Sequence, residues 1–124
     1  MIQLTVIAVG GATGALLRFW VSTSVYSLLG RGFPYGTFTV NVVGSLLMGL
    51  LFVILQDRLS VSAEWRAFLL IGVLGSFTTF STFSIETFNL FEDGENIKAV
   101  MNMLLSVLTC VAATWIGIMA GRQL

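Results

Sequence analysis

Four long apolar segments occupy almost the whole chain and decide what it can fold into. They cover about residues 2–28, 34–56, 63–91 and 97–121. Roughly 20 apolar residues are needed to cross a bilayer as a helix, so each segment is long enough. Only 10% of the 124 residues are charged, whereas about 25% are charged in a typical soluble domain. The sequence therefore predicts an all-α membrane protein, a single domain over residues 1–124 with four transmembrane helices per subunit.

The composition also argues against several classes of function. The formal net charge is zero and there is no basic tail, so nucleic-acid binding has no electrostatic support. The chain has no histidine and a single cysteine, Cys110, which argues against zinc sites and disulfide frameworks. No predicted span holds paired carboxylates or a nucleophile beside a base, so we expect no enzyme. The N-terminus lacks the basic region of a cleaved signal peptide, and we expect the first segment to remain as a membrane helix.

The third apolar segment contains a stretch that is unlike a lipid-facing helix. Residues 74–84 read LGSFTTFSTFS, in which serines and threonines alternate with phenylalanines after a glycine. In hydrocarbon, an irregular or hydroxyl-rich backbone survives only where protein or a water-filled cavity surrounds it. A break inside a membrane helix marks a binding or permeation site. We therefore expect the third helix to be broken mid-membrane, near residues 75–79.

Two polar stripes run along otherwise apolar segments. In each of them, polar residues recur every four positions, which keeps them near one face of a helix. The members are Thr37, Asn41 and Ser45 in the second segment, and Asn102, Ser106, Cys110 and Thr114 in the fourth. Hydroxyl and amide donors can replace the water around a small anion, without trapping the ion as a lysine would. For Asn41, both a ligand-facing role and a role in joining two helices fit the pattern.

Phenylalanine adds a second kind of donor to the interrupted stretch. Phe77, Phe80 and Phe83 follow one another at intervals of three residues, near one helix face. The ring edge is the positive part of the aromatic quadrupole, so an edge-on ring can contact an anion. A phenylalanine ladder that only packs helices is the alternative, and the interleaved hydroxyls favour the anion site.

Two charged residues within the spans have open roles. Arg18 fits an interfacial anchor whose side chain snorkels to the headgroups, or a residue that shapes a pore entrance or packs helices. Glu86 fits a solvent-exposed helix end, but it also shares a face with Thr82 and Phe83 if the helix resumes after the break.

The basic residues do not choose an orientation in the membrane. Three lie on each predicted side: Arg58, Arg66 and Arg122 against Arg18, Arg31 and Lys98. Under the positive-inside rule this balance gives no preferred direction of insertion. A chain that inserts in both directions can pair with an oppositely oriented copy. We therefore expect a dual-topology antiparallel homodimer in the lipid bilayer.

Residues 36–45 (GTFTVNVVGS) and 72–84 (GVLGSFTTFSTFS) closely resemble the CrcB/Fluc family of small four-helix fluoride channels of microbes. The resemblance extends over essentially the whole chain. It implies an antiparallel dimer with two fluoride pores in the bacterial inner membrane. It also implies passive export of cytoplasmic fluoride, which relieves fluoride toxicity.

The resemblance implies roles for particular residues as well. Phe80 and Phe83 would present ring edges to fluoride, and Asn41 would donate to the ion from its amide. The polar track would consist of Ser81, Thr82, Asn102, Ser106 and Cys110. Glu86 would lie at a vestibule. Asn102 stands where the family often has a tyrosine, and we expect this departure to change ion coordination more than the fold.

The resemblance further implies a structural sodium ion at the centre of the dimer. The backbone carbonyls of Gly75 and Thr78, with the same pair from the partner copy, would hold it. Freed carbonyls at a helix break are hard oxygen ligands that need a partner in a dry interface, which fits such a cation.

Three other functions are alternatives to a fluoride channel. A small dual-topology multidrug or cation exporter needs a carboxylate deep inside a helix, and the first segment has none. A proton-coupled fluoride antiporter needs a buried titratable relay, which the spans lack. A non-transporting scaffold subunit leaves both polar stripes unexplained.

Overall fold

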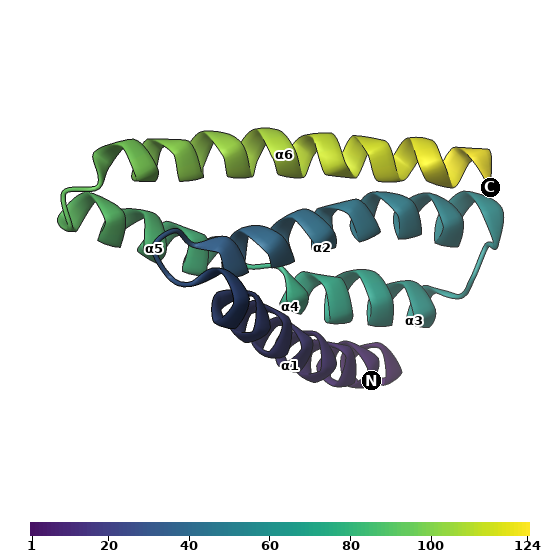
Figure 1. The fold of residues 1–124 in the computed structure, drawn as a ribbon. Coiled ribbons are helices and arrows are strands. Elements are labelled where there is room, and N and C mark those ends of the chain that lie inside the picture. Colours follow the sequence, from purple (N-terminus) through teal and green to yellow (C-terminus); the bar gives the residue numbers. More distant parts are fainter.

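The computed structural model describes all residues from Met1 to Leu124 as a bundle of helices (Figure 1). The first helix, α1, spans Ile2–Leu29. The second, α2, spans Tyr35–Val53 and continues as a π-helix, η1, over Ile54–Arg58. By length and composition the chain has four helices that can cross a membrane. The all-helical membrane prediction is therefore confirmed.

The third crossing is assembled from several helical pieces. Its first half begins with α3 (Ala63–Arg66), passes through the π-helix η2 (Ala67–Leu74) and ends in α4 (Gly75–Phe77). After two non-helical residues the chain resumes as α5 (Phe80–Glu92). Ser62 caps the start of this crossing, since its hydroxyl accepts a hydrogen bond from the Trp65 N–H at 3.4 Å. The last helix, α6, spans Asn96–Gln123.

The interruption of the third crossing is shorter than the sequence suggested. We expected it near residues 75–79, but Gly75 has helical dihedral angles (φ −61°, ψ −33°) and α4 continues to Phe77. Only Thr78 and Thr79 leave the helix. The reason is local: the Thr78 N–H still bonds to the Leu74 carbonyl at 3.2 Å, whereas the Thr79 N–H is taken by a side chain of α2. The outer ends of the four crossings differ from the expected ones by at most two residues.

The helices alternate in direction, as four consecutive crossings must. Figure 1 shows α2 and α6 side by side and running the same way, with α3 to α5 returning in the opposite direction and α1 crossing at an angle. Glycines allow the closest approaches. A Cβ at Gly117 would collide with the backbone of α2 at Leu46, and one at Gly14 would collide with the Val73 carbonyl of η2. The spacings Gly10-xxx-Gly14 and Gly117-xxx-Gly121 are typical of helices that pack this closely.

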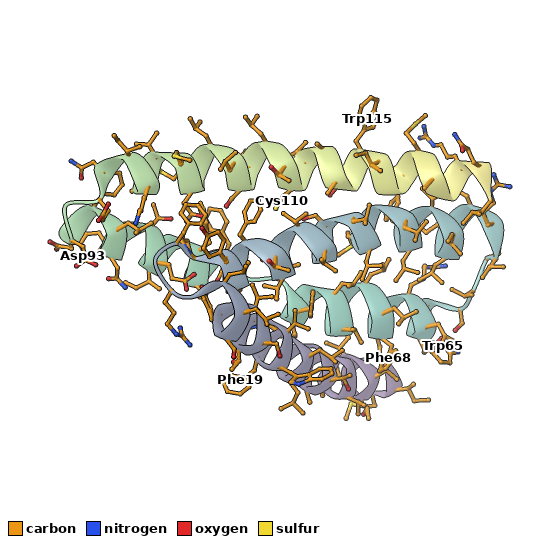
Figure 2. All side chains as sticks on the ribbon, viewed as in Figure 1. Phe19, Trp65, Phe68, Asp93, Cys110 and Trp115 are labelled. Carbon is orange, nitrogen blue, oxygen red and sulfur yellow. The ribbon has the colours of Figure 1, made fainter.

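A single copy of the chain buries little of itself. Only 22 of the 124 residues are buried, and many large apolar side chains are exposed along α1, α5 and α6. Trp115 is an example: it is 65% exposed and points away from the bundle (Figure 2). Apolar surface of this extent must be covered by lipid or by protein.

Candidate functional site

The break between α4 and α5 is the centre of the candidate site. Thr78 (φ −88°, ψ 159°) and Thr79 (φ −154°, ψ 118°) are both extended. The Thr78 hydroxyl donates to the Leu74 carbonyl at 3.1 Å and closes the end of α4. Thr79 caps α5, because its Oγ1 accepts a hydrogen bond from the Thr82 N–H at 3.2 Å. The threonines therefore satisfy backbone groups on both sides of the break.

Asn41 of α2 holds the break from the opposite side. Its Oδ1 accepts a hydrogen bond from the Thr79 N–H at 2.8 Å, and its Nδ2 donates to the Thr79 carbonyl at 3.0 Å. The carboxamide thus pairs with an extended residue as a neighbouring strand would. Since the amino group has two hydrogens, one remains for another acceptor. Asn41 therefore joins two elements and keeps one donor, so the two roles weighed for it are compatible.

The same hydrogen bonds leave two carbonyls without their helical donors. In a continuous helix the Thr79 and Thr82 N–H groups would bond to the carbonyls of Gly75 and Thr78. Here they go to Asn41 and to the Thr79 hydroxyl instead. The carbonyl end of α4 is a negative helix terminus and the start of α5 a positive one. The break therefore places an end that favours cations beside an end that favours anions.

A cavity of about 360 Å³ adjoins the break and gathers residues from α2, α5 and α6. Of the predicted site residues, it brings together Asn41, Thr78, Phe80, Phe83, Ser106 and Cys110. No charged side chain lines it. Cys110 lies on the side of α6 that faces this space (Figure 2). The cavity therefore combines neutral hydroxyl and amide groups with aromatic rings.

The two phenylalanines at the cavity differ in their exposure. Phe83 is 8% exposed, whereas Phe80 is 74% exposed. Their ring centroids lie 5.2 Å apart and their planes are inclined by 45°. A tilted pair of this kind directs ring edges and faces in different directions. Phe80 therefore contacts the Phe83 ring but leaves most of its own surface exposed.

Asn102 and Ser106 form a buried group with a residue of α5. The Asn102 Nδ2 donates to the Thr87 hydroxyl at 2.8 Å, and the Ser106 hydroxyl donates to the Asn102 Oδ1 at 3.3 Å. Thr87 in turn donates to the Phe83 carbonyl at 2.7 Å. Ser106 reaches the cavity, but Asn102 is only 1% exposed and does not line it.

Glu86 lies apart from the cavity, against α1. Its Oε2 accepts a hydrogen bond from the Tyr26 hydroxyl at 2.7 Å, and its Oε1 is buried without a partner. Arg31 stacks on the Tyr26 ring with its guanidinium carbon 4.4 Å from the centroid. A smaller cavity of about 170 Å³ is lined by these three residues together with Asp93 and others. Glu86 is therefore not a freely solvated helix end.

The remaining predicted residues lie outside the main cavity. Ser81 is exposed, with its hydroxyl 3.4 Å from that of Thr79. Thr82 is half-buried and its hydroxyl accepts from Thr79 at 3.1 Å. Arg18 is half-buried on α1, and its Nε is enclosed without a hydrogen-bond partner.

Sequence reasoning missed Tyr26 and Thr87 as site residues. The Tyr26 hydroxyl bonds to Glu86 and lies 3.4 Å from the Thr37 hydroxyl. Its position near the end of a long span gave no signal of these long-range partners. Thr87 directly follows Glu86 and shares a helix face with Phe83 at the i, i+4 spacing. That spacing was the available signal.

Comparison with known proteins agrees with this architecture. A family model described as CrcB-like protein, Camphor Resistance (CrcB), matches residues 5–118. The chain is similar to proteins named fluoride-specific ion channel FluC. It is 52% identical to that of Geobacter metallireducens over 100% of both chains, and 50% identical to that of Coxiella burnetii over 98% of this chain and 99% of the relative.

A third relative is longer. The fluoride-specific ion channel FluC of Methylococcus capsulatus is 54% identical over 99% of this chain, which spans only 54% of that relative's length. The family match covers nearly all of the residues that form the helices, the break and the cavity. The chain belongs to the CrcB-like family.

Proposed function

We propose that this protein is a fluoride-selective ion channel that lets fluoride leave the cytoplasm passively and so relieves fluoride toxicity. The observation that carries the proposal is the uncharged cavity beside the break, where Asn41, Phe80, Phe83, Ser106 and Cys110 meet. The relatives are named fluoride-specific ion channels, which supports fluoride as the ion and a role as a channel rather than an enzyme. The four apolar helices and the bacterial relatives support a multi-pass protein of the inner membrane.

The cavity chemistry supports a small anion as the conducted species. Neutral donors compensate the loss of hydration without holding the ion as a fixed positive charge would. The second amide hydrogen of Asn41 is one such donor, and the ring edges of Phe80 and Phe83 supply others. The start of α5 adds the positive end of a helix, in the manner of the broken helices of transporters.

The working unit in this proposal is a dual-topology antiparallel homodimer with two pores. Phe80 is 74% exposed in the single chain. The cavity that it lines also includes Val107 and Val111, which are exposed on α6. A second copy laid over this face covers these apolar groups and completes the wall of each pore. The balanced basic residues support an opposite orientation for that copy.

A structural sodium ion at the centre of the dimer is the second part of the proposal. In this proposal the break in the third helix lies at mid-membrane, and the Gly75 and Thr78 carbonyls are the ligands. The support is that the usual helical donors of these carbonyls bond to Asn41 and to Thr79 instead. Two carbonyls from each copy are hard oxygen ligands suited to such a cation. When bound, the ion supplies a positive charge that offsets the crowding of four carbonyl dipoles.

The membrane potential suffices as a driving force for this function. Fluoride enters as the neutral weak acid and ionises in the cytoplasm, where it is trapped. Each charge that crosses 100 mV is worth about 2.3 kcal/mol. The remaining predicted residues Ser81, Thr82 and Glu86, with Arg18 near the mouth, then lie along the approaches to the pore rather than at its cavity.

Reconstitution in liposomes tests the proposal against an antiporter. Fluoride release is followed with a selective electrode while valinomycin and a potassium gradient set the voltage, and in parallel under a pH gradient without voltage. We expect release to follow the voltage and to ignore the pH gradient. Release that follows only the pH gradient would support the proton-coupled antiporter and contradict the channel.

A separate experiment tests the central sodium ion. Replacing sodium by lithium or a bulky organic cation during purification is expected to weaken the dimer if the central ion is present.

A further inference from the structure

Three side chains form a directional hydrogen-bonded chain between α6 and α5. The Ser106 hydroxyl donates to the Asn102 Oδ1 at 3.3 Å, and the Asn102 Nδ2 donates to the Thr87 hydroxyl at 2.8 Å. The Thr87 hydroxyl donates to the Phe83 carbonyl at 2.7 Å. The three residues are buried, with 6%, 1% and 6% of their surfaces exposed. Every proton in the chain therefore points away from the cavity and toward α5.

Thr87 sets this direction. Because its single proton goes to the Phe83 carbonyl, it offers only lone pairs to Asn102, which must turn its amino group toward α5. The carboxamide oxygen then faces Ser106 and takes the proton of that hydroxyl. Ser106 lines the cavity, so in this state it presents lone pairs to the cavity. An anion at this wall would meet an acceptor, which repels it.

The chain has a second arrangement that needs no movement of the backbone. Rotating the Asn102 carboxamide by half a turn exchanges two atoms of nearly equal size. Thr87 can then donate to the Asn102 oxygen, and the Asn102 amino group can donate to Ser106. The Ser106 proton is released toward the cavity, where an anion can accept it. Without an anion this state has one hydrogen bond fewer, and with an anion the number is equal.

We propose that Thr87, Asn102 and Ser106 form a reversible relay in which Thr87 is a positioning residue. An anion that reaches Ser106 reverses the relay, and its departure lets Thr87 restore the original direction. The competition between the two directions keeps binding at this wall weak, as conduction requires. The inference rests on the proposed function, because it assigns the relay to the passing fluoride ion.

Flux of the reconstituted dimer at several fluoride concentrations tests the relay. Replacing Thr87→Val removes the hydroxyl and keeps the shape, so the original direction loses its advantage of one bond. We expect the half-saturating fluoride concentration to fall about fivefold, as for one neutral hydrogen bond. In a Ser106→Ala background the same change is expected to leave the half-saturating concentration unmoved. An equal shift in both backgrounds, or no shift in either, would overturn the relay.

Two further variants separate positioning from packing. Thr87→Ser keeps the hydroxyl and is expected to retain the wild-type half-saturating concentration; a shift like that of Thr87→Val would count against the relay. Thr13→Val is the matched control, because the Thr13 hydroxyl also donates to the carbonyl four residues earlier, at 2.9 Å, on the exposed face of α1. It is expected to leave the half-saturating concentration unchanged, and an equal fall there would mean a general effect of losing such a hydroxyl.

A measurement without flux keeps the inference apart from the proposed function. In ¹⁵N-labelled dimer, the side-chain amide resonances of Asn102 are compared between wild type and Thr87→Val without fluoride. The relay predicts that the two amide hydrogens change environment, whereas identical resonances would contradict it. If wild type conducts no fluoride but these resonances do change, the proposed function fails and the positioning role of Thr87 stands.

Discussion

Each of the two polar stripes contains one asparagine, yet the surroundings of Asn41 and Asn102 differ. Asn41 pairs with the backbone N–H and carbonyl of one extended residue, Thr79. Asn102 pairs with two hydroxyls, those of Thr87 and Ser106. A backbone group cannot exchange donor for acceptor, whereas a hydroxyl can do so by rotating. The first asparagine is therefore a fixed brace for the break, and the second belongs to an adjustable network.

The comparison teaches that periodicity alone does not define the role of a polar residue in a span. Both asparagines follow the same four-residue spacing within an apolar segment. The two asparagines differ in the element that they face. Asn41 faces an interrupted backbone whose N–H and carbonyl need partners, whereas Asn102 faces an intact helix whose carbonyls already have donors. The variants below break or sharpen this distinction.

The largest effect is expected at the two phenylalanines that adjoin the brace. Phe80→Ile and Phe83→Ile each remove an aromatic edge and are expected to abolish measurable fluoride flux in liposomes. Phe83 is buried, and the loss of three buried carbons there costs about 2 kcal/mol of stability, so the dimer is expected to survive in size-exclusion chromatography. Phe88→Ile, a 54% exposed position on the same helix, is the control. Wild-type flux in both cavity variants would refute the ring-edge role.

Removal of the brace is expected to have the next largest effect. Asn41→Ala loses two hydrogen bonds to Thr79, which lowers the free energy of unfolding by about 2 kcal/mol. Flux is expected to fall severely, because the break loses its geometry and the cavity loses an amide donor. Thermal unfolding and flux are measured together, with Asn96→Ala at the exposed start of α6 as the control. Equal rates for mutant and wild type would reduce Asn41 to a contact without function.

The adjustable asparagine is expected to respond differently. Asn102→Leu keeps the volume and removes both hydrogen bonds of the carboxamide, which releases the Ser106 proton toward the cavity. Flux should persist, while the half-saturating fluoride concentration falls about fivefold. Concentration-dependent flux measures it. If Asn102→Leu abolished flux as Asn41→Ala does, the two asparagines would have the same role and the comparison would fail.

The smallest effect is expected at the smaller cavity, which Tyr26, Arg31 and Glu86 line. Tyr26→Phe removes the hydroxyl that donates to Glu86, and a hydrogen bond to a charged group is worth about 2 kcal/mol. Because Glu86 lies outside the main cavity, we expect the melting temperature to fall and the flux to change less than in the other variants. Tyr35→Phe, which removes a hydroxyl without a hydrogen-bond partner at an exposed position, is the matched control. A loss of flux as large as that of Asn41→Ala would place Glu86 in the conducting path.

The sequence predicted the helices well because the length of an apolar segment is a local property. Through the resemblance to the family, Asn41, Phe80, Phe83, Ser106 and Cys110 were expected to belong to one pore, and these five residues line one cavity. The sequence did not predict that Gly75 stays helical, because a glycine permits a break without requiring one. The true break depends on Asn41 capturing the Thr79 N–H, a contact between residues 38 positions apart.

The long-range partners of Tyr26, Glu86 and Thr87 were beyond sequence reasoning for a similar reason. The Tyr26–Glu86 hydrogen bond joins residues 60 positions apart, and it depends on the angle at which α1 crosses the bundle. Asn102 was assigned to the polar track through its stripe, whereas the structure turns it inward to Thr87. A stripe defines a helix face, but the packing angle decides whether that face borders a cavity or a neighbouring helix.

The central claim is that an uncharged cavity beside the braced break conducts fluoride in preference to larger anions. Voltage-driven efflux of fluoride and of chloride from the same proteoliposomes, at equal concentrations and without a pH gradient, tests it most directly. The account predicts fast release of fluoride with chloride release no greater than from protein-free vesicles, and loss of the fluoride signal in Phe80→Ile. Equal release of the two anions, or fluoride release that survives Phe80→Ile and Asn41→Ala together, would contradict it.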